Sequence, residues 1–187
     1  MNKPNPDIAK AARCIQQGGI IALPTEGVIG LSCDPNNESA IKRLLDIKQR
    51  PAHKGLILVA ADLSQLQPFI QRLSAELLDK LTAIRSYPTT WIAPAQKNIS
   101  KLITGDFNSV AIRLTTHPLV KELCQQCDHA LISTSANISN QPSRRDLSTL
   151  DPNLVHQLDY LLAGTVGPHQ GPSEIRDLLT DTVLRQG

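Results

Sequence analysis

Apolar residues recur along the chain with two periods, one typical of amphipathic helices and one typical of short buried strands. From Ile8 to Ile15 they follow the i, i+3, i+4, i+7 spacing, and we expect Asp7 to cap this helix and Gly18 to end it. The same spacing predicts helices over residues 37–48, 74–84, 118–127 and 152–158. Short apolar runs predict strands over residues 20–23, 56–59, 90–93, 110–114, 130–133, 160–163, 175–178 and 183–185.

These helices and strands interleave, but several strands follow one another without a helix between them. That order favours an α/β fold with one open, twisted, mixed sheet and flanking helices over a pure βαβ array. The sequence shows no internal repeat and no low-complexity linker, and a length of 187 residues suits one domain. We therefore expect a single domain over residues 1–187.

Composition and charge narrow the class of protein. Hydrophobic residues make up 41% of the chain and charged residues 19%, which excludes a disordered or fibrous protein. Nineteen lysines and arginines oppose 17 acidic residues, and the resulting net charge of +2 is too small to indicate nucleic-acid binding by itself. Only 3% of the residues are aromatic, so we expect an aliphatic core and no base-stacking surface.

The sequence also bears on location and on metal sites. No apolar run approaches the roughly 18 residues of a membrane-spanning helix, and Met1 to Pro6 lacks the apolar centre of a secretory signal. We therefore expect a cytoplasmic protein without membrane contact. Cys124 and Cys127 fall on the apolar face of their predicted helix, so we expect thiols in the core and no protein-bound metal.

The residues after the first strand place polar groups at a strand end. Thr25 offers a hydroxyl and Glu26 a carboxylate there, and Gly27 and Gly30 let the backbone approach a ligand closely. A turn whose polar residues merely cap a helix explains the pattern equally well.

Positive charge gathers after the second helix. Lys48 continues the apolar stripe of that helix, and burying its ammonium is costly unless an anion meets it. Arg50 and Lys54 follow in the next turn, so the three cations could converge on one anion. Cations at a helix C-terminus are also favoured by the helix dipole, and a lysine can extend to solvent, so a structural explanation stays open.

A hydroxyl-rich turn follows another predicted buried strand, where residues 133–139 read Ser-Thr-Ser-Ala-Asn-Ile-Ser. Free backbone N–H groups in such a turn can hold a phosphate or a carboxylate, although ordinary Ser/Thr/Asn turns are common. Arg113, near the end of its own strand, is either a surface residue or a bidentate clamp for a carboxylate or phosphate.

Taken in order, these segments resemble the threonylcarbamoyl-AMP synthases of the TsaC/YrdC-like family. The resemblance runs from Gly18 to Arg185 and is most specific over residues 133–139. Its supporting motifs are Pro24-Thr25-Glu26 with Gly30-Leu31, Lys48-x-Arg50-Pro51, Arg113, and Pro172-Ser173-x-Ile175-x-Asp177. It implies the short form of the family, in which an open twisted sheet surrounds a large, concave, positively charged pocket.

The resemblance also implies an activity. Members of the family join L-threonine, bicarbonate and ATP into L-threonylcarbamoyladenylate and release pyrophosphate. The adenylate then passes to partner proteins that modify adenosine 37 of tRNAs that decode ANN codons, a role compatible with direct tRNA contact. ATP would carry Mg²⁺ on its triphosphate, without a protein cage for the ion.

Carried onto this sequence, the resemblance implies two sets of binding residues. The residues expected to hold ATP are Lys48, Arg50, Lys54, Ser109, Ser135, Ser143 and Arg185. The residues expected to hold L-threonine are Thr25, Arg113, Ser133 and Ser173, with Arg113 on the carboxylate. Lys48 and Arg50 would be catalytic, because fixed positive charge lowers the repulsion among anionic reactants. The segment 140–149 is expected to close over the nucleotide.

Two other functions are compatible with the same residues. A basic concavity could bind tRNA or double-stranded RNA through shape and phosphates, in RNA or ribosome maturation, without chemistry. Such binding would weaken steeply with salt and would not depend on ATP. A relative that binds nucleotide but has lost the reaction is the third alternative.

Overall fold

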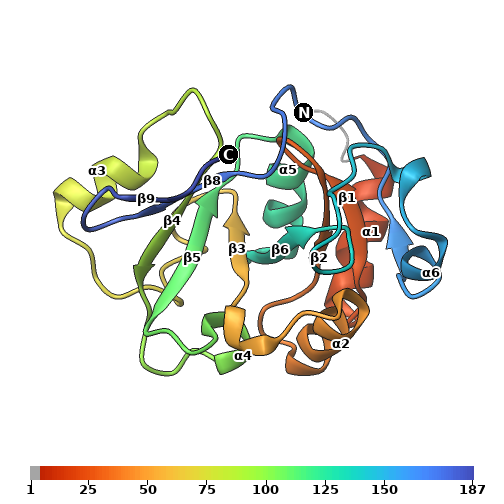
Figure 1. The fold of residues 1–187 in the computed structure, drawn as a ribbon, viewed down its shortest axis with the longest axis horizontal. Coiled ribbons are helices and arrows are strands. Elements are labelled where there is room, and N and C mark those ends of the chain that lie inside the picture. The colour runs from red at the N-terminus through yellow and green to blue at the C-terminus, as the bar shows by residue number, and fades with distance from the viewer. Residues whose placement is uncertain (1–4) are drawn as a thin grey trace.

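The computed structural model describes residues 5–187, so Met1 to Pro6, where no secretory signal is predicted, lies mostly outside the described residues. The helices are α1 (Pro6–Gln16), α2 (Glu38–Lys48), α3 (Ala75–Thr82), α4 (Lys101–Thr104), α5 (Pro118–Cys127) and α6 (Pro152–Val155). The strands are β1 (Ile21–Pro24), β2 (Ile29–Ser32), β3 (Ile57–Ala60), β4 (Thr89–Pro94), β5 (Ser109–Leu114), β6 (Leu131–Ser135), β7 (Tyr160–Leu161), β8 (Glu174–Asp177) and β9 (Val183–Arg185). Figure 1 shows their arrangement.

Across residues 5–187 the strands form one mixed sheet in the order β7-β1-β2-β6-β3-β5-β4-β8-β9. The pairs β1/β7, β3/β5 and β4/β8 are parallel and the remaining pairs are antiparallel. The predicted α/β class, with an open mixed sheet and flanking helices, is confirmed (Figure 1).

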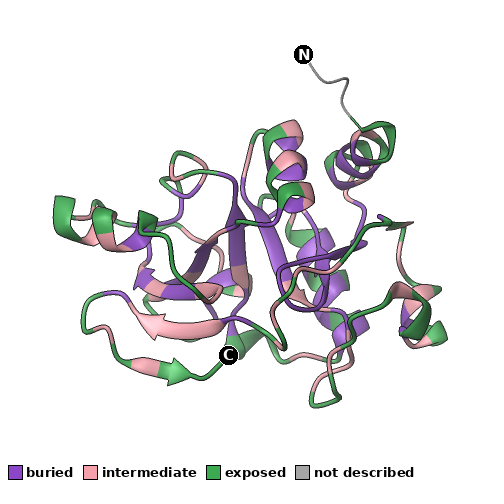
Figure 2. Ribbon diagram, turned by 90° about the horizontal axis from the view of Figure 1, so that it is seen from above, coloured by how far each residue is buried: buried purple, intermediate pink, exposed green. Residues whose placement is uncertain are grey.

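Both faces of the central strands are covered, because successive side chains of a strand point to opposite faces. In β1, Ile21 and Leu23 belong to one apolar cluster with α1 and α5, whereas Ala22 belongs to a second cluster that contains the buried face of α2. Figure 2 shows the buried residues concentrated in these central strands, whereas the outer hairpin is intermediate to exposed and the helices expose their outer faces. The central strands therefore provide a rigid base for residues at their ends.

Two local expectations near helix ends are wrong. Asn5, not Asp7, caps α1, since its side chain accepts a hydrogen bond from the Asp7 N–H, and Pro6 occupies the first turn. The helix predicted over residues 74–84 would place Ile84 on its apolar face, but α3 ends at Thr82 and Ile84 is 97% exposed. Beyond the end of a helix the 3.6-residue spacing no longer predicts which side is buried.

Strand β2 is not predicted from the sequence, in which the residues after β1 indicate a polar turn. Ile29–Ser32 instead form a fully buried strand, antiparallel to both β1 and β6. The turn is confined to residues 25–28, where Thr25 donates from its N–H and from its Oγ1 to the Val28 carbonyl, at 3.0 and 2.8 Å. The tight hairpin brings Thr25 and Glu26 to one end of the sheet.

Candidate functional site

A cavity opens on the sheet face that α5 covers only in part. Val59 and Leu131 pack with α5, and two residues away on the same strands Ile57 and Ser133 line the cavity. The cavity and the solvent-open space at its mouth together measure about 690 Å³. The cavity is lined by Thr25, Glu26, Gly27, Val28, Gly30, Arg50, Leu56, Ile57, Pro88, Arg113, Ser133, Thr134, Ser135, Gly171, Pro172, Ser173 and Arg185.

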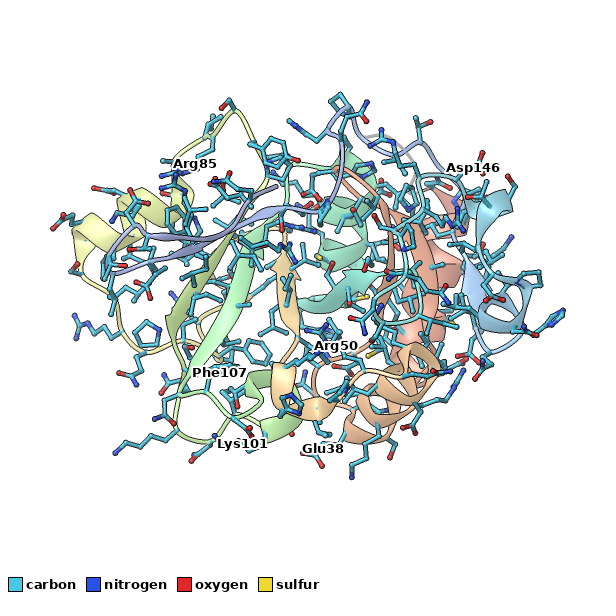
Figure 3. All side chains as sticks on the ribbon, in the orientation of Figure 1. Glu38, Arg50, Arg85, Lys101, Phe107 and Asp146 are labelled. Atoms are coloured by element: carbon cyan, nitrogen blue, oxygen red, sulfur yellow. The ribbon has the colours of Figure 1, made fainter. Side chains whose placement is uncertain are left out.

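Three arginines from separate segments line this cavity. Arg50 donates from Nε and Nη2 to the Gly55 carbonyl at 3.2 and 2.9 Å, and Figure 3 shows it near the middle of the molecule. Arg185 donates from Nη2 to the Ser173 carbonyl at 2.6 Å. Burial lowers the pKa of both guanidinium groups, and the charges of Arg113 and Arg50 lower the pKa of Arg185 further. The arginines are thus close enough to repel one another, which favours a bound anion.

Glu26 is the one acidic residue among the described residues that line the cavity. Its Oε2 lies 3.2 Å from Nη2 of Arg113, and its Oε1 accepts a hydrogen bond from Thr115 Oγ1 at 2.7 Å. Burial raises the pKa of this carboxyl, but the charge of Arg113 and the Thr115 hydrogen bond outweigh it, so the pKa is lowered overall. Glu26 is therefore ionised at neutral pH.

Lys48 is buried beneath the serine-rich turn, with 2% of its surface exposed. Its Nζ donates hydrogen bonds to the carbonyls of Ser135 and Asn137, the second at 2.7 Å, and the Lys48 carbonyl accepts from Ser139 N at 2.8 Å. Burial, and secondarily the charge of Arg50, lowers the pKa of Lys48 from 10.5 to about 8. Its predicted burial is confirmed, and the partners that the structure shows are backbone carbonyls.

The segment 164–173 forms another wall of the cavity through Gly171, Pro172 and Ser173. The Ser173 hydroxyl lies 2.7 Å from the hydroxyl of Thr90 on β4, which is fully buried behind it. At Gly27 a Cβ atom would lie 2.0 Å from the Gly171 carbonyl oxygen, so only glycine allows this close approach.

The loop at residues 140–149 is tied to the same wall. Arg145 donates hydrogen bonds to the carbonyls of Gly27, Gly167 and His169, and the Arg144 carbonyl accepts from Ile29 N at 2.7 Å. Closure of this loop over a nucleotide stays a prediction. In this structure the loop holds segment 164–173 against the hairpin that carries Thr25 and Glu26.

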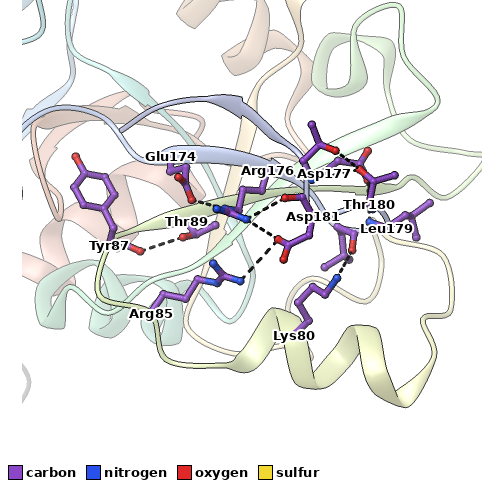
Figure 4. Close-up of polar contacts among 12 residues, drawn as sticks. Lys80, Arg85, Tyr87, Thr89, Glu174, Arg176, Asp177, Leu179, Thr180 and Asp181 are labelled. Carbon is purple, nitrogen blue, oxygen red and sulfur yellow. Dashed lines mark hydrogen bonds and ion pairs between the residues drawn. The ribbon is translucent and has the colours of Figure 1, made fainter.

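The outer hairpin β8–β9 presents Arg185 and follows Ser173. Arg176 stabilises it through Nε to Glu174 Oε1 at 2.5 Å and Nη1 to Asp181 Oδ1 at 2.8 Å (Figure 4). Neither Arg176 nor Glu174 lines the cavity. This ion pair thus resembles the Arg113–Glu26 pair chemically but lies outside the site.

The structure brings most of the residues expected to bind ligand together, and it leaves others apart. The expected residues that line the cavity are Thr25, Arg50, Arg113, Ser133, Ser135, Ser173 and Arg185. The expected residues outside its lining are Lys48, Lys54, Ser109 and Ser143. Lys48 lies next to the cavity through the Ser135 carbonyl, whereas Lys54 is exposed.

Sequence reasoning gave no role to two residues that support this site. Glu26 was noted only as a carboxylate at a strand end, and its contact with Arg113 joins residues 87 positions apart, which one sequence does not reveal. Thr90 was placed in a strand but not near Ser173. Thr90 lies in a buried strand, and its buried hydroxyl needs a polar partner, which could have pointed to a residue such as Ser173.

Metal-ligating side chains do not gather in the described part of the chain. No group of three or more His, Cys, Asp or Glu residues there could hold a metal ion. Cys124 and Cys127 are buried in the cluster beneath α5, and burial raises the pKa of each thiol to about 12. None of the helices over residues 5–187 has the length and apolarity needed to cross a membrane.

Comparisons with known proteins agree with this geometry. The family model for Sua5, YciO and YrdC, described as "Telomere recombination", matches residues 13–187. A protein of Vibrio vulnificus named threonylcarbamoyl-AMP synthase is 46% identical over 97% of this chain and 98% of its own length. One of Photobacterium profundum with the same name is 43% identical over 97% and 99%.

Solved structures show the same fold. P. abyssi Sua5 complexed with L-threonine superposes with a TM-score of 0.85 at 29% identity, covering 95% of this chain, which spans about half (53%) of the Sua5 chain. E. coli YciO, at 24% identity, supports the fold alone, with a TM-score of 0.81 over 100% of this chain and 91% of its own. With a family model covering nearly every described residue and relatives aligned from end to end, this chain belongs to the Sua5/YciO/YrdC family.

Proposed function

We propose that this protein joins L-threonine, bicarbonate and ATP into threonylcarbamoyl-AMP and releases pyrophosphate, for modification of adenosine 37 in tRNAs that decode ANN codons. The convergence of Arg50, Arg113 and Arg185 on one cavity beside the serine-rich turn carries the proposal. The relatives of the same name at 43–46% identity support it. We place this nucleotidyl transfer in the cytoplasm and in one domain, residues 1–187, and direct tRNA contact and transfer to partner proteins belong to the same proposal.

The reaction joins three reactants that carry negative charge, and fixed cations lower their repulsion. The threonine amine attacks the bicarbonate carbon and water leaves, which gives a carbamate. A carbamate oxygen then attacks the α-phosphorus of ATP, and pyrophosphate leaves with the electron pair of the broken P–O bond. None of these steps needs a covalent bond to the protein, so positioning and charge supply the catalysis.

Seven of the lining residues have a role in this scheme. Arg113 would bind the threonine carboxylate, with Thr25, Ser133 and Ser173 around the amino acid. The phosphates would be held by Arg50, Arg185 and Ser135.

Four ATP-binding residues expected from the resemblance do not line the cavity. These are Lys48, Lys54, Ser109 and Ser143. Lys48 would contribute by fixing the Ser135 carbonyl and hence the turn that faces the phosphates. Mg²⁺ would be held by the triphosphate oxygens.

An omission assay tests the proposal. Pyrophosphate release should require ATP, L-threonine and bicarbonate together, and equal release without threonine would refute it. Arg50→Met should lower the rate at least about tenfold, because a half-buried guanidinium that lines the proposed phosphate site is lost. Arg72→Met, which removes an exposed arginine outside the cavity lining, is the matched control and should retain the wild-type rate. Salt-sensitive RNA binding with no pyrophosphate release would instead support the RNA-binding alternative.

A further inference from the structure

We propose that Glu26 is a positioning residue that holds the Arg113 guanidinium in place for the carboxylate of the amino-acid substrate. The inference rests on the proposed function, because it names the residue that orients the arginine expected to bind L-threonine. Glu26 and Arg113 are both buried, line the same cavity and form an ion pair at 3.2 Å.

Arg113 has no other polar anchor in the described part of the chain. Its Nε is buried without a hydrogen-bond partner, and its one ion pair is with Glu26 Oε2. The charges of Arg50 and Arg185 act on the same cavity, so without Glu26 they would push the Arg113 guanidinium away. A side chain held at one Nη atom keeps its remaining donors for a ligand, as bidentate binding of a carboxylate requires.

Glu26 is itself fixed, which makes it an effective anchor. The exposed fraction of the residue is 4%, and its Oε1 accepts from Thr115 Oγ1 at 2.7 Å and from Thr116 N at 3.3 Å. The Thr115 hydroxyl in turn accepts from His117 N at 3.2 Å. Oε2 is buried against Arg113 and has no hydrogen-bond donor of its own. The carboxylate therefore acts through Arg113 and does not contact the substrate.

A simple electrostatic role for Glu26 predicts the opposite outcome. As the sole acidic residue among the described residues of the cavity lining, it reduces the positive potential that three arginines create. If that were its whole effect, Glu26→Gln would bind every anionic ligand more tightly. If Glu26 positions Arg113, the same change weakens binding of carboxylates that use Arg113 and leaves ATP binding unchanged or tighter.

Calorimetric titration of wild-type protein and Glu26→Gln with four ligands separates these effects. The ligands are ATP, L-threonine, (R)-3-hydroxybutanoate, which lacks the amine, and L-threoninamide, which lacks the carboxylate. We expect the Kd of threonine and of hydroxybutanoate to rise by about tenfold, the scale of a charged hydrogen bond to a ligand. The Kd of threoninamide and of ATP should not rise.

Several results would overturn the inference. These are tighter or unchanged threonine binding, equal weakening of all four ligands, or weakening confined to the two ligands with an amine, which would mean that Glu26 holds the amine. Asp159→Asn, which removes the carboxylate partner of Arg43 outside the cavity, is the matched control and should leave all four Kd values unchanged.

The folding of the variants and the proposed function are tested separately. Should Glu26→Gln fail to fold, Thr115→Val removes the hydroxyl that fixes Glu26 while keeping both charges, and it should weaken the two carboxylates in the same pattern. A threonine Kd equal to that of wild type in folded Thr115→Val would then count against the inference. If the wild type releases no pyrophosphate in the omission assay but binds threonine through Glu26 and Arg113, only the proposed function fails.

Discussion

The buried ammonium of Lys48 should make the stability of the protein depend on pH in one direction. Lys48 is 2% exposed, and burial with the nearby charge of Arg50 lowers its pKa from 10.5 to about 8. Between these two values the unfolded chain keeps the proton and the folded chain has lost it. Because the unfolded state then binds more protons, the free energy of unfolding rises with pH over this window.

The size of this rise follows from the two pKa values. A pKa difference of 10.5 − 8 = 2.5 corresponds to about 3 kcal/mol when the whole window is crossed. Between pH 7 and pH 10, the range in which unfolding is measured, the free energy of unfolding should rise by about 2.5 kcal/mol. Below pH 8 both states carry the charge, so the stability contribution present above pH 10.5 is lost as pH falls through 8.

Buried thiols oppose this effect in the wild type. Burial raises the pKa of Cys33, Cys124 and Cys127 from 9.0 to about 12, so the unfolded chain releases these protons first. Their stabilisation is complete below pH 9 and is lost as pH rises towards 12. The wild-type curve alone is therefore ambiguous, whereas its difference from a Lys48 variant cancels the thiols.

Lys48→Met is the variant that isolates the ammonium. Urea unfolding of both proteins at pH 7, 8, 9 and 10 can be followed by fluorescence of the single, buried Trp91. We expect the wild-type free energy of unfolding, minus that of the variant, to rise by about 2.5 kcal/mol from pH 7 to pH 10. A difference that stays flat would refute the reasoning, since Lys48 would then be charged throughout.

The same variant tests how Lys48 serves the site. Methionine removes the buried charge, leaves the Asn137 carbonyl unpaired at about 1–3 kcal/mol, and takes one of two donors from the Ser135 carbonyl, which keeps the Asn137 N–H. These costs are comparable to the burial penalty removed, so the variant should still fold at pH 7. Pyrophosphate release should nevertheless fall sharply, because the turn beside the phosphates loses its anchor.

Three further substitutions test the walls of the cavity. Gly27→Ala should destabilise the fold by about 1–3 kcal/mol in urea unfolding and raise the KM for threonine, because its Cβ meets the Gly171 carbonyl oxygen at 2.0 Å. Arg113→Lys keeps the charge but loses bidentate geometry, and calorimetry should show about tenfold weaker threonine with unchanged ATP. Thr90→Val should raise the KM for threonine a few-fold and leave kcat unchanged, because the Ser173 hydroxyl loses the hydrogen bond that fixes it. Wild-type values in folded protein would contradict each of these expectations.

The apolar pattern predicted the helices and strands whose apolar residues are regularly spaced along their own length. The stripe of α1 and the runs that became β3 and β5 were placed to within a residue or two, because each is periodic over its own length. Strand β2 was missed because it has only four residues, contains a glycine and follows a polar turn. Its pairing with β1 and β6, which the sequence does not reveal, is what identifies it as a strand.

The site was predictable in its chemistry but only partly in its contacts. The position of Lys48 in an apolar stripe correctly indicated that it is buried. The sequence does not distinguish whether backbone carbonyls or a bound anion accept its hydrogen bonds, and the structure shows carbonyls. Which of them meets Lys48 depends on where the turn after β6 lies in space. The partner of Arg113 does not follow from strand order, because β6 and β3 lie between β2 and β5, and only the three-dimensional shape of the folded sheet brings Glu26 to Arg113.

The positive charge of the cavity exists only in the folded chain. Arg50, Arg113 and Arg185 come from a loop after α2, from β5 and from the last strand, so their mutual repulsion arises when the sheet assembles. Folding must supply the free energy that holds them together, and Glu26 offsets part of it at Arg113 alone. A site that neutralised all three would be more stable and would bind anions less well. A single carboxylate, buried where it can orient one arginine, leaves the other two charges for the phosphates of the proposed reaction.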